Sequence, residues 1–408
     1  VLVARDARLS SPALYSAVLS GLARVPGIKP IEAGMATTPM AYFLVCSLGA
    51  DGGIMVTASH NPKEYNGLKI MGPMAFPISG TDVLKMVGRA ARRQTTNDKR
   101  QTTISTLQDT NKQFVKRYAA YLKRSFRIKK PITIVCDSSN GAAGVILAAL
   151  KVPCVRIISI NSKADGNFPA HGPNPMLTGA MDELRRTVKK YKADFGAAFD
   201  ADADRVFFVD ERGREILADA ITRLLAPRFK GAVAIDVRSG YLIRRSGLPF
   251  IEGRVGHYFA KKLMLKNKLE FGGELSGHFY FRPRFGKKFA AYDSALLTLA
   301  AVASQASALK AKRSSLGQWC DELPRYYQSG EINFRVKGAK RIMARMERIF
   351  GKNAERVSHL DGVRMDFKDH WINIRTSNTE PLLRINIEAT TKRVLEKELQ
   401  VAKKLIQG

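Results

Sequence analysis

Short apolar runs that end at turns recur along the chain. They include residues 53–56, 132–136, 195–199 and 232–236, and each is followed by Gly, Asn, Asp or Ser. Runs of this length, rich in aliphatic and aromatic residues and bounded by turn residues, are typical of buried strands. Strands that alternate with helical patterns predict an α/β fold.

Helix signals fall between these runs. Ser11-Pro12 has the pattern of an N-cap followed by proline, which predicts a helix through about Leu22. Residues 181–191 and 294–308 are further predicted helices, and 155–160 is a predicted strand. We find no internal sequence repeat, but three strand-turn-helix units in a row suggest three similar domains, and the last ninety residues alternate strand and helix patterns.

The length and composition bound the architecture. A prior of roughly 150 residues per domain gives about three domains for 408 residues, and four spaced polar motifs raise our expectation to four. No apolar run approaches the ~18 residues that span a bilayer, so we expect a cytoplasmic protein without a membrane partner. Cys46, Cys136, Cys154 and Cys320 show no C-x-x-C spacing, which argues against a disulfide framework or a zinc site.

The net charge of +31 is high for a metabolic enzyme. A basic balance of this size can attract nucleic acid or anionic lipid. No helix-turn-helix, RNP-like or zinc-finger pattern accompanies it, so we expect a solvated basic surface and no nucleic-acid partner. The oligomeric state stays open.

The loop at residues 57–66 follows the first apolar run and supplies a candidate nucleophile. A strand that stops at Ser59-His60-Asn61-Pro62 presents the hydroxyl of Ser59 at the edge of a sheet. Serine needs a base or a positive field for activation, and His60 and Lys69 lie close in sequence. Taken alone, the segment fits a purely structural turn better than a nucleophile.

Asp200, Asp202 and Asp204 alternate along an extended segment and therefore share one face. Three carboxylates this close repel one another unless a cation lies among them, and hard oxygen ligands select magnesium or calcium. An EF-hand is excluded, because Arg205 stands where its loop needs glycine. We predict a magnesium site, and a solvated acidic turn is the alternative.

Two further loops carry polar groups. Glu274, Ser276 and His278 lie in a glycine-flanked loop, for which a locally bonded histidine is the simple interpretation. An arginine fork with neighbouring hydroxyls suits a phosphate group, although a plain turn fits equally well. The residues of this second loop are Arg375, Ser377, Asn378 and Thr379.

The four motifs, in this order, closely resemble those of the α-D-phosphohexomutase family, and their wording is most similar to its phosphomannomutase/phosphoglucomutase branch. The resemblance covers nearly the whole chain. It implies an α/β fold of three similar mixed-sheet domains plus a C-terminal α+β domain around a central cleft. We expect a phosphoserine domain at 1–110, a metal-binding domain at 111–211, a sugar-recognition domain at 212–320 and a phosphate-binding domain at 321–408.

The resemblance also implies an activity. Phosphorylated Ser59 exchanges its phosphoryl group with a phosphorylated hexose, so that phosphate moves reversibly between positions 1 and 6 through a hexose 1,6-bisphosphate, which also serves as activator. One Mg²⁺ is held by the three aspartates and a phosphoserine oxygen. Arg205 neutralises the phosphoserine, Lys69 and His278 are acid/base candidates, Glu274 binds sugar hydroxyls, and the Arg375 loop holds the non-reacting phosphate.

Other positions resemble substrate contacts of the family or depart from its pattern. Arg238, Arg254 and His257 are candidate contacts, although Arg238 replaces an expected lysine. Arg8 resembles an arginine ahead of the first helix, and a solvated surface charge is the alternative. Ala201 replaces a usual glycine.

The family's Tyr-Asp-x-Arg-Gly segment is not in this sequence, so we expect an N-terminally incomplete first domain. The preferred sugar stays open. The alternatives are a phosphoglucosamine mutase and a catalytically reduced basic binding protein on the same scaffold.

Overall fold

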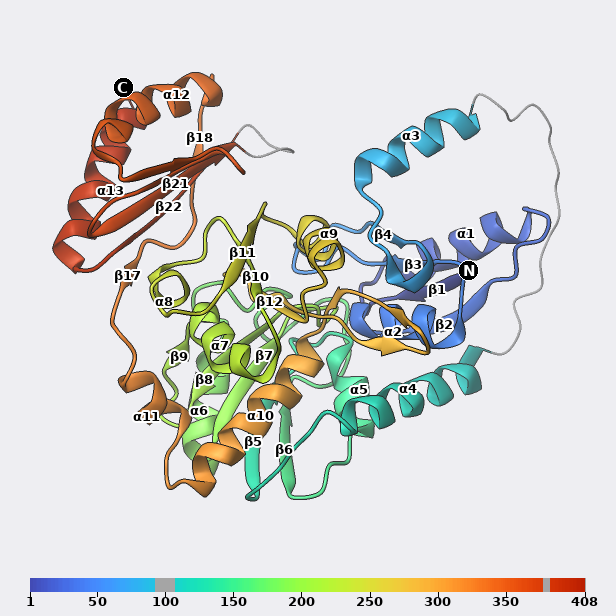
Figure 1. Cartoon of the computed structure of the whole chain (residues 1–408). Coiled ribbons are helices and arrows are strands. Elements are labelled where there is room, and N and C mark those ends of the chain that lie inside the picture. Colours follow the sequence, from blue (N-terminus) through green and yellow to red (C-terminus); the bar gives the residue numbers. More distant parts are fainter. Residues whose placement is uncertain (92–106, 377–381, 408) are drawn as a thin grey trace.

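The structure, a computed structural model of the chain, describes residues 1–91, 107–376 and 382–407 (Figure 1). The polar stretch at 94–105, whose composition predicts a surface loop, lies outside these residues. Four sheets follow one another along the chain, three with helices packed against mixed strands and one antiparallel. The predicted four-domain α/β architecture is therefore confirmed. Among the described residues, no helix is long and apolar enough to cross a bilayer.

The first sheet has the strand order β2-β1-β3-β4, with β1 parallel to both neighbours and β4 antiparallel to β3. Its helix α1 begins at the predicted Ser-Pro signal, but the capping position is Ser10 and Ser11 instead bonds Asp6. The elements are β1 (Leu2–Arg5), α1 (Ser11–Ala23), β2 (Ile31–Met35), α2 (Thr38–Leu48), β3 (Gly53–Val56), β4 (Leu68–Met71) and α3 (Gly80–Ala91).

The second sheet repeats this plan in the order β6-β5-β7-β8-β9. The predicted strands 155–160 and 195–199 coincide with β6 and β7. Glu211, at the expected end of this domain, lies in the turn between β8 and β9, so the sheet continues to Ile216. The elements are α4 (Leu107–Lys123), β5 (Ile132–Asp137), α5 (Ala143–Ala149), β6 (Val155–Ile160), α6 (Asp182–Tyr191), β7 (Phe195–Phe199), β8 (Val206–Asp210) and β9 (Glu215–Ile216).

The third sheet has the order β11-β10-β12-β13-β16 and again places an antiparallel strand after a parallel pair. The elements are α7 (Ala218–Leu225), β10 (Val233–Asp236), α8 (Tyr241–Arg244), β11 (Phe250–Gly253), α9 (His257–Asn267), β12 (Phe271–Gly273), β13 (Phe279–Phe281), the hairpin β14 (Arg284–Phe285) and β15 (Lys288–Phe289), β16 (Tyr292–Asp293), α10 (Ala295–Ala311) and α11 (Leu316–Asp321). Three similar sheets thus follow from a sequence without a visible repeat.

The C-terminal sheet is antiparallel, and α12 and α13 pack against it (Figure 1). The elements are β17 (Tyr327–Gln328), β18 (Ile332–Arg335), α12 (Ala339–Phe350), β19 (Arg356–Ser358), β20 (Val363–Asp366), β21 (His370–Thr376), β22 (Leu382–Ala389) and α13 (Lys392–Gln407).

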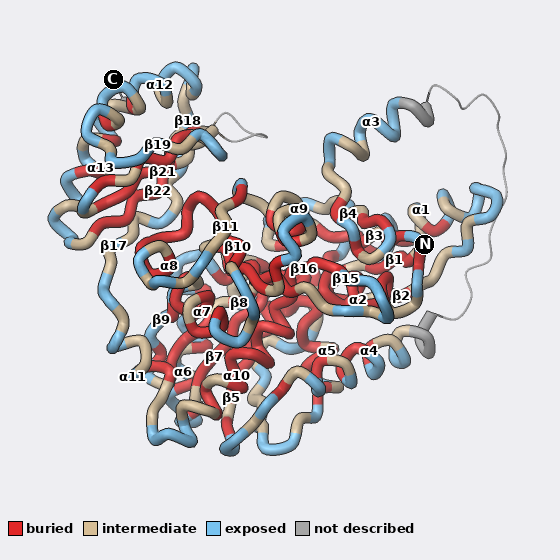
Figure 2. Tube along the Cα trace, in the orientation of Figure 1, coloured by how far each residue is buried: buried red, intermediate tan, exposed pale blue. Residues whose placement is uncertain are grey.

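One hydrophobic core extends through the first three domains, whereas the C-terminal domain has a core of its own (Figure 2). Helix α10 packs on α7 of the third domain and also on β5, β7 and β8 of the second sheet. Cys136 lies in the shared core, as a buried small apolar residue would. We call the first three domains together the body of the molecule.

Candidate active site

Three of the predicted motifs occupy equivalent places in the three similar sheets. Ser59 lies between β3 and β4, the three aspartates between β7 and β8, and Glu274 to His278 between β12 and β13. In each sheet this is the loop that leaves a parallel strand and enters the antiparallel one. Because the sheets share one core, these loops converge, as the contacts of Ser59 and His278 below demonstrate.

Ser59 lies in the loop in a conformation that serine rarely adopts. Its φ of +51° is in the left-handed region, and its side chain is nearly buried. The Oγ atom donates to Asp200 Oδ2 at 2.9 Å and lies 3.5 Å from Asp204 Oδ1. Strained backbone of this kind persists only where the surroundings fix it. The structure therefore brings the candidate nucleophile onto the candidate metal ligands.

Arg8 holds the loop that carries Ser59 by hydrogen bonds to its backbone. Its Nε donates to Asp6, and its four remaining N–H groups donate to backbone carbonyl oxygens of the serine loop. The acceptors are Ser59 at 2.5 Å, Asn61 at 2.7 Å, Pro62 at 2.7 Å and Tyr65 at 3.0 Å. The residue is 0% exposed. The interpretation as a solvated charge is therefore wrong, and no guanidinium N–H is left for a substrate.

The three aspartates form a buried oxygen cluster. One carboxylate oxygen of each lies within 4.8 Å of the others. Asp202 Oδ1 is buried without a hydrogen-bond partner among the described residues, so an oxygen with free lone pairs faces the cluster. Burial, followed by repulsion from Asp204 and Asp202, raises the pKa of Asp200 well above its usual value. With Ser59 Oγ beside it, this donor set fits one hard divalent cation.

Lys69 and Thr38 complete the cluster. Lys69 Nζ lies 2.7 Å from Asp202 Oδ2 and 2.5 Å from Asp204 Oδ2, and Thr38 Oγ1, at the start of α2, donates to Asp202. Although burial opposes it, the attraction of Asp202 and Asp204 raises the pKa of Lys69, so the amine is protonated. Ala201 does not have a left-handed φ, so the alanine that replaces the family's glycine is accommodated, and Ala203 takes that conformation instead.

His60 does not contact the candidate nucleophile. Among the described residues, the partners of Ser59 Oγ are the two carboxylates. Burial, together with the charge of Arg205, lowers the pKa of His60 to about 3, so this imidazole is neutral near pH 7. It therefore offers no positive field to the serine.

Arg205 joins the aspartate loop to the Glu274 loop. Its Nε donates to His278 Nε2 at 3.0 Å and lies 4.0 Å from Asp200 Oδ2, and the two residues also form a backbone bridge. Gly277, at φ +82°, packs so closely on the ring of Phe207 that a Cβ would lie 2.7 Å from it. This tight turn holds His278 against Arg205.

Glu274 is the centre of a polar cluster in the third domain. Its oxygens accept from Tyr280 and Ser276 at 2.9 Å each, and Arg238 Nη2 lies 3.7 Å away. Arg238 is held by Asp236 at 2.6 Å.

The segment before α9 carries two more candidate contacts. His257 begins this helix, and burial, followed by the charge of Lys261, lowers its pKa to about 3. Its ring centroid lies 6.3 Å from that of His278. Arg254 is exposed and stacks on Phe259 at 4.3 Å.

Glu331 links the third and fourth domains through Arg375, the remaining candidate residue that the structure describes. It pairs with Arg375, with Arg384 at 3.3 Å and with Arg238 at 3.5 Å. Ser377, Asn378 and Thr379 lie outside the described residues. Glu331 thus connects Arg375 of the fourth motif to Arg238, which lies beside Glu274.

Sequence reasoning missed Thr38, Lys261, Asp293 and Glu331. Lys261 stands four residues after His257, on the same face of a helix, and this spacing was an available signal. Asp293 immediately precedes Ser294, the cap of α10, and an acidic residue there is indistinguishable from ordinary capping. Thr38 and Glu331 carry no local signal, since only the folded chain gives them partners.

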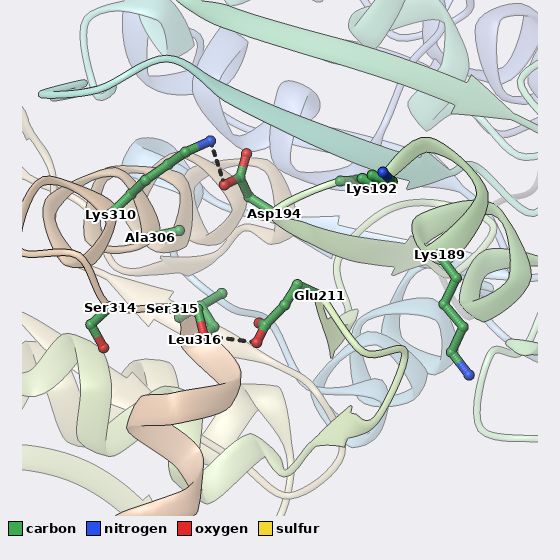
Figure 3. Close-up of a pocket in the computed structure, with 10 residues that line it drawn as sticks. Lys189, Lys192, Asp194, Glu211, Ala306, Lys310, Ser314, Ser315 and Leu316 are labelled. Carbon is green, nitrogen blue, oxygen red and sulfur yellow. Dashed lines mark hydrogen bonds and ion pairs between the residues drawn. The ribbon is translucent and has the colours of Figure 1, made fainter.

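A hollow of about 420 Å³ lies apart from these loops, between α6, α10 and α11 (Figure 3). Lys310 at its rim is paired with Asp194 at 2.7 Å, and Glu211 accepts from Ser315. Lys189 and Lys192 also line the hollow, but none of its lining residues carries a buried polar atom without a hydrogen-bond partner, so we assign no ligand to it.

Comparison with known proteins agrees with the four motifs. Family models described as phosphoglucomutase/phosphomannomutase alpha/beta/alpha domains I, II and III match residues 1–98, 112–213 and 213–327, and the model of the C-terminal domain matches 331–403. The phosphomannomutase of Escherichia coli K12 is 36% identical over 407 residues, with 95% of this chain and 87% of that protein covered.

Solved structures show the same fold. A phosphoglucomutase/phosphomannomutase family protein from Burkholderia thailandensis superposes with a TM-score of 0.82 at 26% identity, covering 100% of this chain and 88% of that one. An Aspergillus fumigatus N-acetylphosphoglucosamine mutase, solved with GlcNAc-6P and magnesium, has a TM-score of 0.61 at 16% identity, covering 100% and 82%. The chain therefore belongs to the phosphoglucomutase/phosphomannomutase family and is a phosphohexomutase, an enzyme of the isomerase class.

Proposed function

We propose that the chain moves a phosphoryl group reversibly between positions 1 and 6 of a hexose, mannose or glucose, through a phosphoserine at residue 59 and a bound hexose 1,6-bisphosphate. The observation that carries this proposal is the position of Ser59 Oγ, 2.9 Å from Asp200 within the three-aspartate cluster. Phosphoryl transfer depends chiefly on positioning and on charge neutralisation, and both are concentrated here.

Asp200, Asp202, Asp204 and an oxygen on Ser59 would hold one Mg²⁺. The ion would supply positive charge to the phosphoryl oxygens. The Aspergillus relative crystallised with magnesium supports this choice of metal. The remaining chemistry belongs to side chains of the chain itself.

In the forward step the sugar hydroxyl attacks phosphorus, a new P–O bond forms, and the bond from phosphorus to Ser59 Oγ breaks. The hydroxyl loses a proton and Oγ gains one. Protonated Lys69, held beside Asp202 and Asp204, is the candidate donor to Oγ. His278 is the other acid/base candidate, but its Nε2 accepts from Arg205 and would have to release that arginine first.

Substrate recognition would be shared between the third and fourth domains. Glu274 with Ser276 suits sugar hydroxyls, and Arg238, Arg254 and His257 lie around the same segment. Arg375 suits the phosphate that does not react, and a phosphate arriving there competes with Glu331 for the guanidinium. Arg8 is removed from this set, because its Nε donates to Asp6 and its other four N–H groups hold the serine loop.

The test begins with intact-protein mass spectrometry of the purified chain, before and after incubation with glucose 1,6-bisphosphate and Mg²⁺. We expect a gain of one phosphate that is lost in Ser59→Ala and retained in the matched variant Ser329→Ala, which alters a serine between β17 and β18 of the C-terminal sheet. Equal phosphate in the wild type and in Ser59→Ala would remove the mechanism.

Turnover assays then separate the candidate substrates. Mannose 1-phosphate, glucose 1-phosphate and glucosamine 1-phosphate, each with its bisphosphate activator, distinguish the proposed activity from a phosphoglucosamine mutase. A chain that turns over none of them but binds nucleic acid with a steep salt dependence would be the basic binding protein instead.

The four cysteines are unpaired, which supports a reducing compartment such as the cytoplasm.

A further inference from the structure

A line of buried polar side chains continues behind His278, away from the serine. Asp293 Oδ2, at the end of β16, lies 2.9 Å from His278 Nδ1, and Asp293 Oδ1 lies 2.7 Å from Lys261 Nζ on α9. Asp293 is 0% exposed and Lys261 is 1% exposed. Ionisable groups are seldom this deeply buried without a function or a compensating partner.

The line ends in the first domain. Lys261 Nζ donates to the hydroxyl of Tyr42 on α2 at 2.8 Å and lies 4.0 Å from the centre of its ring. At the other end, His278 accepts from Arg205 of the second domain. The sequence Tyr42, Lys261, Asp293, His278 and Arg205 therefore crosses all three domains of the body.

The contacts define the proton position on His278. Arginine keeps its protons, so Arg205 Nε can only donate, and His278 Nε2 must be the acceptor. A neutral imidazole that accepts at Nε2 carries its proton on Nδ1. Nδ1 lies 2.9 Å from Asp293 Oδ2, an ion-pair distance from a carboxylate oxygen that can only accept.

A second metal ion at this place does not fit the same contacts. Asp204, His278 and Asp293 lie close enough for one. However, His278 Nδ1 carries a proton, Nε2 is occupied by Arg205, and the ammonium of Lys261 already stands at Asp293. A cation there would displace two existing partners.

We propose that Asp293 and Lys261 are positioning residues of the phosphoryl transfer, which act through His278 to aim Arg205 at the phosphoserine. This inference rests on the proposed function. Asp293 holds His278 in the Nδ1–H tautomer, His278 presents Nε2 to Arg205, and Arg205 is thereby held beside Asp200, where the phosphoryl group must lie. Lys261 compensates the charge of Asp293 and ties the line to α2.

The first test uses the wild-type enzyme. Nitrogen NMR of ¹⁵N-histidine-labelled protein at pH 7.5, with His278 assigned by comparison with His278→Gln, reports the tautomer directly. We expect a neutral ring protonated at Nδ1. A ring protonated at Nε2 would place two donors against each other at Arg205 and would overturn the proposal, whatever the activity of the enzyme.

The second test is Asp293→Asn. The amide can turn its NH₂ toward Nδ1, which favours the Nε2–H tautomer and expels Arg205. We expect kcat to fall by about 10- to 100-fold, the range seen when groups supporting a site are removed. KM for the hexose 1-phosphate should stay within about twofold, because the sugar contacts are elsewhere. The His278 tautomer should change in the same variant.

Asp210→Asn is the matched control. Asp210 is a buried aspartate paired with Arg214 at the opposite end of the strand that Arg205 precedes. It should lower stability without lowering kcat. If Asp293→Asn also keeps its kcat and only lowers the melting temperature, the role is structural and the proposal fails. If Asp293→Asn does not fold, the wild-type tautomer decides. A wild type inactive on every hexose phosphate would refute the proposed function while leaving the tautomer measurement intact.

Discussion

The body and the C-terminal domain are built on opposite principles. The first three sheets share one apolar core, and their catalytic loops meet through buried contacts. The C-terminal domain has its own core, and the contacts identified between it and the third domain are polar. Polar interfaces between domains are typical of parts that move relative to each other. The difference shows that the candidate catalytic loops of the body share one apolar core, whereas Arg375, the candidate phosphate-binding residue, belongs to a domain with a core of its own.

Two buried charged residues of the C-terminal domain contribute to this interface. Glu388 accepts from the backbone of Tyr241 at 2.6 Å and from Trp371 at 3.0 Å. Arg364 donates to carbonyl oxygens of Val237 at 2.5 Å and Ser239 at 3.1 Å. Both residues therefore dock onto the segment between β10 and α8, next to Arg238. A movement at this interface would shift Arg375 relative to Arg238 and Glu274.

Replacing Arg8 should destabilise the body without destabilising the C-terminal domain, and we expect this change to have the largest effect. Arg8→Met removes the cationic partner of Asp6 and the donor of four carbonyl oxygens, which should cost about 3–5 kcal/mol of unfolding free energy. Urea unfolding followed by fluorescence separates the regions, because Trp319 packs on the shared core and Trp371 lies in the C-terminal domain. Single-tryptophan variants should show a lowered midpoint at Trp319 only. Equal shifts at both would mean that the two regions unfold as one unit.

Asp202→Ala should lower turnover but leave binding of the sugar phosphate nearly unchanged. Losing one oxygen ligand from the cluster should lower turnover by about 10²–10³-fold and remove its dependence on magnesium. Binding of glucose 1-phosphate, measured by calorimetry, should change little, because Arg375 and Glu274 are untouched. Unchanged turnover would contradict the metal assignment.

Glu388→Gln should loosen the docking of the C-terminal domain. The variant loses a charge-assisted acceptor for the backbone of Tyr241, which should cost about 1–3 kcal/mol at the interface. We expect the Trp371 transition to move to lower urea and small-angle scattering to report a larger radius. Glu398→Gln is the control, since this glutamate on α13 is buried in the same domain and pairs only with Lys397 among the described residues. Identical effects of both variants would deny the interface its role.

The smallest effect concerns the pH dependence of the Glu331 contact. Although burial opposes it, the charges of Arg375, Arg238 and Arg384 lower the pKa of Glu331. A lowered pKa in the folded state stabilises above the unfolded value near 4.5, and this stabilisation is lost as the pH falls through the folded value. Glu331→Gln should therefore cost about 1 kcal/mol or less at pH 6, and this cost should shrink as the pH falls through the folded value. A difference from wild type that is constant across this range would contradict the ion-pair assignment.

Much of the body could be predicted because its signals are local. Strands such as 155–160 and 195–199 are continuous apolar runs, and the loops that follow them carry the chemistry. What failed depended on burial. Arg8 has the sequence context of an exposed charge, and only the folded loop above it supplies four carbonyl oxygens.

The supporting residues of the site were equally hidden from the sequence. Lys261 and Asp293 are 32 positions apart, and neither belongs to a short motif. Their pairing results from the packing of α9 beside β16. No local pattern encodes a contact of this kind.

The equivalent placement of the three catalytic loops has a consequence for how such an enzyme can change. Each loop begins where the ladder of its parallel strand ends, so its side chains can be exchanged without rewriting the sheet that carries them. Equivalent loops of the three similar sheets thus carry a hydroxyl, a set of carboxylates and an imidazole. Substitutions in these loops should therefore change the chemistry of the site and leave the strand pairing of the three sheets intact.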